Sequence, residues 1–182
     1  MTAVAARRVE DLDWRTWRAT DRATLVFCVD GGRILLIRKK RGLGAGKVNG
    51  PGGRLEGDET PRQCAVRECQ EELHVEPLNP KEFGRLRFQF VDGYGLDVHV
   101  FRADEFLGQA RETDEAIPLW TAFGDIPYDE MWQDDRLWIP FLLAERTFDG
   151  YFIFDGDSML DHTLEADVDL SEVPGPRADA TR

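Results

Sequence analysis

The sequence predicts an α+β fold in which a mixed β-sheet lies between helices. Two observations support this prediction: apolar runs of strand length separated by glycine-rich turns, and two longer segments with helical features. The 182 residues suit one domain with a sizeable core, and no internal repeat interrupts the pattern.

The first part of the predicted sheet is a β-hairpin. Residues 23–29 form a continuous apolar run, Gly31 and Gly32 mark a turn, and the apolar pattern resumes over 34–37. Residues 39–53 contain six glycines and one proline, so this stretch is expected to be a loop whose backbone can approach a ligand closely.

The remaining elements follow from capping and alternation. A helix is expected from Thr60, a good N-cap, and Pro61 to about Leu73 or His74. Further strands are predicted over residues 83–91, 96–101, 118–123, 151–154 and 159–164, with a second helix near 135–145 and a final turn at 155–157.

Charge and cysteine content exclude several classes of protein. With 23 basic and 35 acidic residues, the net charge of −12 gives no electrostatic support for binding nucleic acid or anionic lipid. Three cysteines without CxxC spacing indicate neither a disulfide framework nor a zinc site. Without an apolar run long enough for a membrane span, the expectation is a soluble cytoplasmic protein.

An acidic stripe follows the glycine-rich loop. Glu68, Glu71 and Glu72 have the i, i+3, i+4 spacing that places them on one face of the predicted helix. A lone stripe of this kind is more often a solvated surface. Directly after a glycine-rich loop, however, it fits a site for Mg²⁺, which prefers carboxylate oxygens and keeps substrate phosphates in its shell.

The wider spacing resembles the Nudix box, GX5EX7REUXEEXGU. Its six fixed letters match Gly53, Glu59, Arg67, Glu68, Glu71 and Glu72. His74 stands where the family has glycine, which is expected to alter how the helix ends. The resemblance implies a Nudix-type α/β/α sandwich and a Nudix nucleoside triphosphate diphosphatase.

The same resemblance implies roles for the box residues. Glu68, Glu71 and Glu72 would bind Mg²⁺, with Mn²⁺ as an alternative, and Glu71 or Glu72 would orient or deprotonate the attacking water. Arg67 would pair with a carboxylate such as Glu59 and fix the helix on the loop.

Segments outside the box, KKRGLGAGKVNGPGG, LDVHVF, MWQDD and GYFIF, resemble the MutT-homologue oxidised purine nucleoside triphosphate hydrolases of animals. By this resemblance Asn49, Asp134 and Asp135 would bond the purine edge and Trp132 would stack on the base. Further residues implied in the substrate site are Thr24, Lys39, Gly52 and Gly53. The backbone of Gly52 and the side chain of Glu115 would be additional metal ligands.

Adjacent aspartates suit a base-reading role. A neutral carboxylic acid donates a hydrogen bond while a carboxylate only accepts, so Asp134 and Asp135 could read both 8-oxo-guanine and 2-hydroxy-adenine. Acids at a helix N-terminus are also favoured without any ligand. Trp138, inside the predicted helix, is expected to be a core residue.

Hydrolysis of 8-oxo-dGTP and 2-hydroxy-dATP to monophosphate and pyrophosphate, sanitising the nucleotide pool, is therefore the leading hypothesis. Leu43, Val48, Pro51 and Leu96 replace Phe, Trp, Phe and Met of the animal enzymes, which reduces stacking area. A methylated purine triphosphate, a nucleotide sugar or a dinucleoside polyphosphate are alternative substrates. A non-enzymatic ligand-sensing module is a further alternative, but it would be expected to have a degraded box.

The chain is expected to act as a monomer on a small nucleotide, with no nucleic-acid polymer or membrane as partner. Residues 1–22 are expected to be an N-terminal extension, 23–167 the Nudix domain and 168–182 a flexible tail. Trp14 and Trp17 indicate that the extension packs, either on its own domain or on a partner.

Overall fold

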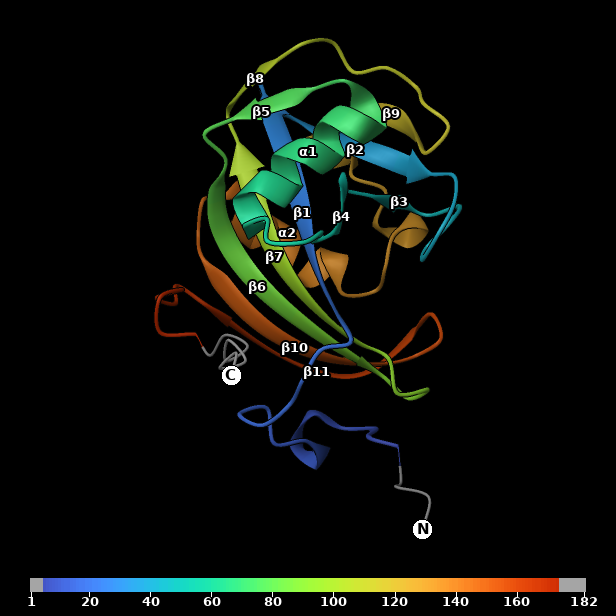
Figure 1. Ribbon diagram of the computed structural model, residues 1–182, viewed down its shortest axis with the longest axis vertical. Coiled ribbons are helices and arrows are strands. Elements are labelled where there is room, and N and C mark those ends of the chain that lie inside the picture. The colour runs from blue at the N-terminus through green and yellow to red at the C-terminus, as the bar shows by residue number, and fades with distance from the viewer. Residues whose placement is uncertain (1–4, 174–182) are drawn as a thin grey trace.

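The structure, a computed structural model, describes residues 5–173. Nine strands form one sheet in the order β11-β10-β6-β7-β1-β2-β3, with β4 paired to β1 and β9 paired to β2, and β5 and β8 form a separate pair (Figure 1). The strands are β1 (Asp21–Asp30), β2 (Arg33–Lys39), β3 (Val48–Asn49), β4 (Gly52–Arg54), β5 (Glu76–Leu78), β6 (Lys81–Phe90), β7 (Gly95–Ala103), β8 (Glu105–Leu107), β9 (Ala116–Ala122), β10 (Phe148–Asp155) and β11 (Ser158–Ala166).

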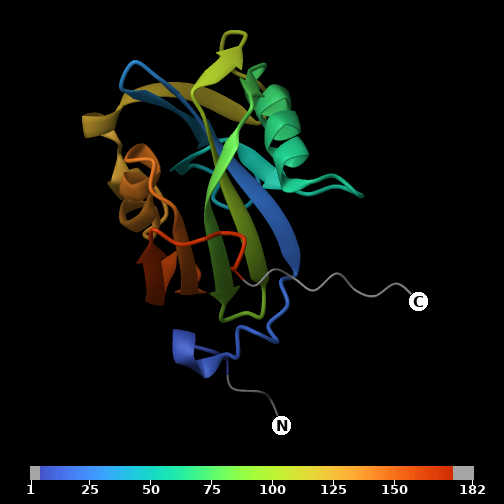
Figure 2. The same cartoon turned by 90° about the vertical axis from the view of Figure 1, so that its left-hand side faces the viewer.

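Two helices cover opposite faces of this mixed sheet. The helix α1 (Pro61–Leu73) lies on one side and α2 (Asp135–Leu143) on the other, as Figure 2 shows. Strand pairs β1·β7 and β6·β10 are parallel, while the other pairs in the sheet are antiparallel. The predicted α+β sandwich with a mixed sheet between helices is thus confirmed.

Successive side chains of β1 point to opposite faces of the sheet and so belong to two different hydrophobic clusters. Val26 and Cys28 pack towards α1, in the cluster that includes Leu73. Phe27 points the other way and meets Trp138 of α2, with ring centroids 5.8 Å apart. Trp138 has no exposed surface, so its expected core position is confirmed.

The glycine-rich stretch 39–53 differs from its prediction as an uninterrupted loop. Two of its short segments pair with neighbouring strands, β3 with β2 and β4 with β1. Glycine is a poor strand residue, so only the tertiary context creates these pairings. The pair β5·β8 was also missed, because its strands have three residues each and β5 contains Pro77.

Both ends of the chain pack on the sheet within the described residues. The ring of Trp14 lies 4.7 Å from that of Tyr151 on β10, and the N–H of Val9 donates to Asp161 on β11 at 2.8 Å. Of the two alternatives, packing on its own domain or on a partner, the described residues of the extension show the first. The N–H of Asp167, the last residue before the predicted flexible tail, donates to Thr147 O at 2.7 Å. Of that tail, residues 174–182 lie outside the described residues.

Charged side chains lie on one face of β6 and β7, and the other face packs into the apolar cluster of Phe27 and Trp138. Arg85 donates from Nε and Nη2 to the two carboxylate oxygens of Asp97, at 2.7 and 2.6 Å, and both residues are buried. Arg87 Nη1 donates to Asp149 Oδ1 on β10 at 2.5 Å. These residues alternate with Leu86 and Phe88, which point into the apolar cluster.

Helix α1 ends at His74, the position where the Nudix box has glycine. The side chain of Thr60 caps the start of the helix, accepting from the N–H of Gln63 at 3.2 Å. His74 adopts the left-handed conformation, with φ 59° and ψ 29°, and its N–H bonds to Gln70 O at 2.9 Å. The helix thus ends as it would with glycine, at the cost of a Cβ in a conformation that favours glycine.

Replacing His74 with glycine is expected to raise the free energy of unfolding by about 0.5–1 kcal/mol, because glycine removes the left-handed strain. Urea unfolding of His74→Gly checks this, with His74→Ala as the control that keeps the Cβ and gains nothing. Equal stability of the glycine and alanine variants would show that the left-handed conformation of His74 carries no strain.

Candidate active site

Three glutamate carboxylates meet beside β4. Glu68 and Glu72 lie one turn apart on α1, and Glu115 immediately precedes β9. Each brings one oxygen to within 4.8 Å of the others. Helix geometry therefore explains two members of this cluster, and the packing of β9 onto β2 supplies the third.

Burial makes the cluster electrostatically strained. Glu72 is only 3% exposed, and burial raises its pKa to about 8. The N–H of Gly52, which donates to Glu72 Oε1 at 3.0 Å, opposes this shift, and the nearby charge of Glu68 adds to it. Burial likewise raises the pKa of Glu68, although Arg67 opposes this shift. Hard oxygen donors that repel one another are the ligand set that a divalent cation fits. The residues present thus match such an ion.

Two glycines allow β4 to approach α1 closely. A Cβ at Gly53 would overlap the carboxyl group of Glu68, and a Cβ at Gly52 would overlap the carbonyl oxygen of Thr24 on β1. Backbone atoms therefore exclude any side chain at position 52, whereas a side chain at position 53 would displace the carboxyl group of Glu68. Their backbone lies directly against the acidic cluster, as expected for Gly52 as a metal-ligand candidate.

Arg67 fixes the helix on the preceding loop, as the Nudix resemblance implied. Its Nε and Nη2 donate to the two oxygens of Glu59 at 3.0 and 2.6 Å, which holds the pKa of Glu59 down at about 2. Its Nη1 reaches Glu68 at 2.9 Å and Glu71 at 3.2 Å. Glu71 is 53% exposed and lies outside the triplet of Glu68, Glu72 and Glu115.

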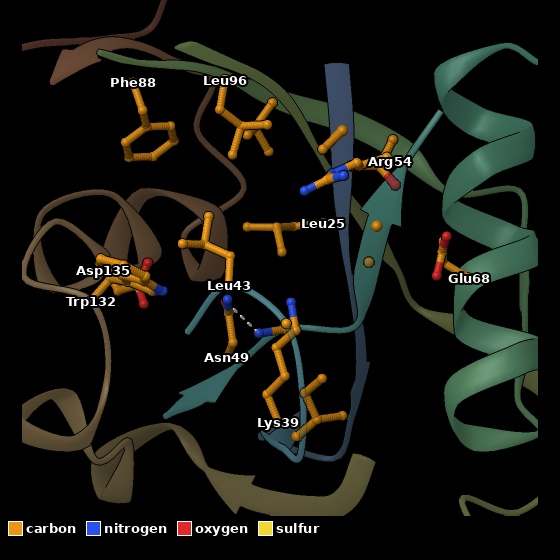
Figure 3. Close-up of a pocket in the computed structure, with 18 of the residues that line it drawn as sticks. Leu25, Lys39, Leu43, Asn49, Arg54, Glu68, Phe88, Leu96, Trp132 and Asp135 are labelled. Carbon is orange, nitrogen blue, oxygen red and sulfur yellow. Dashed lines mark hydrogen bonds between the residues drawn. The ribbon is translucent and has the colours of Figure 1, made fainter. Parts of the chain in front are cut away.

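The acidic cluster lies at one end of a cavity of about 610 Å³. Figure 3 shows Glu68 at this end and Trp132 with Asp135 at the other; Asn49 and Lys39 lie along one side, and Phe88 and Leu96 along the opposite side. Of the site residues expected from the sequence, those lining the cavity are Thr24, Lys39, Asn49, Gly52, Gly53, Glu68, Glu72, Glu115, Trp132, Asp134 and Asp135. Arg67 and Glu71 are not among the lining residues.

The far end of the cavity contains two buried aspartates with free hydrogen-bonding capacity. Asp134 Oδ2 accepts from Trp138 Nε1 at 2.9 Å, but Asp134 Oδ1 and Asp135 Oδ2 have no partner among the described residues. Burial raises the pKa of Asp134 to about 6, and burial together with the charge of Asp134 raises that of Asp135 well above its usual value. Such a pair holds a proton more readily than free aspartate does, and can present both a donor and an acceptor.

The ring of Trp132 is held on several sides. Phe154 meets it edge-on with centroids 5.6 Å apart, and Lys47 Nζ lies 5.1 Å from its centroid. A Cβ at Gly44 would lie 2.8 Å from Trp132 Nε1, so the glycine-rich stretch packs directly on the indole. Of the positions that differ from the animal enzymes, Leu43 and Leu96 line the cavity, whereas Val48 and Pro51 are buried outside its lining.

Sequence reasoning missed several lining residues. Arg54 directly follows the box glycine, and Arg41 donates to Glu115 Oε1 at 2.7 Å. Tyr94 lies between the strands predicted over residues 83–91 and 96–101, where the sequence indicates no site residue. Leu25 alternates with Ala23 on β1, a period-2 signal that could have placed it on the cavity side.

A mixed sheet between helices, with a carboxylate cluster at one end of a cavity, is the arrangement that a divalent-metal-dependent hydrolase of phosphoric anhydrides requires. Residues 19–142 match the NUDIX domain family model. The chain belongs to the Nudix family and is a hydrolase. Within the described residues, no helix is long and apolar enough to cross a membrane.

The chain is similar over most of its length to characterised relatives. It is 46% identical to the oxidized purine nucleoside triphosphate hydrolase of Danio rerio, over 81% of this chain and 96% of that one, and 41% identical to the Mus musculus protein of the same name, over 78% and 92%. The crystal structure of the MutT protein from Bacillus halodurans superimposes with a TM-score of 0.73 at 25% identity, covering 80% of this chain and 97% of that one.

Proposed function

We propose that the protein hydrolyses oxidised purine nucleoside triphosphates, such as 8-oxo-dGTP and 2-hydroxy-dATP, to monophosphate and pyrophosphate, and so sanitises the nucleotide pool. The observation that carries the proposal is the pair of unpartnered buried oxygens on Asp134 and Asp135, in the same cavity as the acidic triplet. Buried polar atoms without partners are rare in native proteins, so their place at the end of a ligand-sized cavity supports a polar ligand edge. The names of the two vertebrate relatives agree with this substrate class.

The base end reads the purine by hydrogen bonding and stacking. In this proposal Asp134, Asp135 and Asn49 bond the polar edge of the base, and Trp132 stacks on its face. Burial raises the pKa values of both aspartates, so the pair holds a proton more readily than free aspartate does, and it can then meet the altered donor and acceptor pattern of an oxidised base. Leu43 and Leu96 provide apolar walls without the stacking area of aromatic residues.

The phosphate end orients the scissile bond. Glu68, Glu72, Glu115 and the backbone of Gly52 would hold Mg²⁺, or Mn²⁺ in its place, and Glu71 would join them if its carboxylate left Arg67. When bound, the ion offsets phosphate charge and lowers the pKa of a coordinated water. Lys39 and Arg41 line the same cavity and would bind phosphate oxygens. Glu71 or Glu72 would orient or deprotonate the attacking water.

Two further assignments belong to this proposal. The first is action as a monomer on a small nucleotide. Cys28, Cys64 and Cys69 are free thiols, which supports the reducing cytoplasm as the location.

The direct test incubates the chain with Mg²⁺ and equal concentrations of 8-oxo-dGTP, 2-hydroxy-dATP, dGTP and ADP-ribose, followed by product identification. Selective formation of monophosphate and pyrophosphate from an oxidised triphosphate is the expected result. Turnover of ADP-ribose alone would keep the Nudix chemistry but overturn the assignment of the base end.

Replacing Glu72 with glutamine is expected to lower kcat by roughly 100-fold or more, because it removes a charged ligand where phosphate charge must be offset. Steady-state kinetics measure the loss, and calorimetry with the monophosphate product checks that nucleotide still binds. Unchanged turnover would refute the metal-site assignment. Glu76→Gln, an acid beyond the C-terminal end of α1 and outside the cavity lining, is a matched control.

Asp134→Asn is expected to change the ratio of kcat/KM between 8-oxo-dGTP and 2-hydroxy-dATP by about tenfold. The amide cannot exchange donor and acceptor roles as a carboxyl group does, and a hydrogen bond to a base edge is worth about 1–3 kcal/mol of discrimination. Competition between the two triphosphates gives this ratio directly. An unaltered ratio would remove Asp134 from the base-reading role.

A further inference from the structure

The end of the N-terminal extension holds the turn between β6 and β7. Trp17 Nε1 donates to Gln89 Oε1 at 2.7 Å. The N–H of Thr20 donates to Gly95 O at 2.7 Å, and the N–H of Gly95 donates back to Thr20 Oγ1 at 3.0 Å. A Cβ at Gly95 would lie 2.9 Å from the Trp17 ring, so the indole lies directly on the backbone of this turn.

Gln89, which accepts the hydrogen bond from Trp17, also donates hydrogen bonds to the backbone of the turn. Its Nε2 donates to Phe90 O at 2.9 Å and to Tyr94 O at 3.2 Å. Gln89 lies between Phe88 and Phe90, both of which line the cavity, so the extension contacts the back of a cavity wall. Its residues can therefore set the position of that wall without reaching the ligand.

Tyr94 is the residue of this turn that lines the cavity. Its ring lies 5.8 Å from that of Phe90, and its hydroxyl donates to Asp21 Oδ2 at 2.8 Å. The same oxygen of Asp21 lies 3.4 Å from Nε of Arg54, which also lines the cavity. Tyr94 thus extends the wall of Phe88, Phe90 and Leu96 towards Arg54.

We infer that Tyr94 is a specificity-determining residue whose ring contacts the purine nucleoside part of the substrate, and that the segment from Trp17 to Asp21 positions this ring. The inference rests on the proposed function and adds to it. Leu43 stands where the animal enzymes have phenylalanine, and the Tyr94 ring supplies aromatic surface to the same cavity. Segment and ring act together because Asp21 and Gln89 fix opposite ends of Tyr94.

The test separates the nucleoside from the phosphates. In Tyr94→Ala, kcat/KM for 8-oxo-dGTP is expected to fall about tenfold, the usual scale for losing one base–aromatic contact, while kcat/KM for the base-free 2-deoxyribose 5-triphosphate stays unchanged. Calorimetric binding of the nucleoside 8-oxo-deoxyguanosine should weaken by a similar factor, which gives a readout independent of turnover. Tyr94→Phe keeps the ring but loses the hydrogen bond to Asp21, so a smaller fall in kcat/KM for 8-oxo-dGTP, of about threefold, is expected. Tyr151→Phe, on the opposite face of the sheet, is the matched control.

Trp17→Phe tests the role of the extension, because it removes the N–H donor to Gln89 and keeps an aromatic ring. It is expected to shift the 8-oxo-dGTP kinetics in the same direction as Tyr94→Phe, with base-free turnover unchanged. Equal effects of Tyr94→Ala on both substrates, or no effect, would overturn the role of Tyr94. No effect of Trp17→Phe would overturn the role of the extension. If the unaltered protein hydrolyses the base-free triphosphate but neither hydrolyses 8-oxo-dGTP nor binds its nucleoside, the proposed function fails and the inference fails with it.

Discussion

The close approach of β4 to helix α1 is the constraint on which the rest of the site depends. Gly53 leaves open the space on α1 that the Glu68 carboxyl group fills, and Gly52 lets β4 pack against the backbone of Thr24 on β1. The approach gives the buried Glu72 a backbone N–H donor and brings the half-buried carboxylate of Glu68 beside it. Arg67 secures the same helix through the Glu59 pair. The close packing of β4 on α1 thus helps to form the arrangement of carboxylates that a cation could occupy.

The parts of the site that depend on local spacing could be predicted, and those that depend on tertiary packing could not. Helical periodicity placed Glu68 and Glu72 together, but it also grouped Glu71 with them. Glu71 shares Arg67 Nη1 with Glu68, but Glu71 is 53% exposed and lies outside the triplet. Glu115 is distant in sequence, and the resemblance to known relatives alone brought it into the site.

The same distinction holds for the fold. Apolar runs and glycine turns gave the long strands to within a few residues, and Thr60 with Pro61 gave the start of α1. The short strands β3 and β4 have no sequence signal, because their pairing exists only when β1 and β2 are already in place. The role of Tyr94 was hidden for a similar reason. A tyrosine between two glycines indicates a turn, and nothing local says that Asp21 and Trp17 will lie beside that turn.

The buried pairs of Arg85 and Arg87 have a consequence for the shape of the cavity. In the observed register Arg87 lies opposite Asp97 and Phe88 lies opposite Leu96. A slip of one residue between β6 and β7 would turn the arginines towards the aromatic cluster and expose the phenylalanines. Unpaired charges there would cost several kcal/mol, so the alternative alignment is excluded. The buried ion pairs on one face of the sheet thereby fix the β6–β7 register that places Phe88 and Leu96 on the cavity side of the other face.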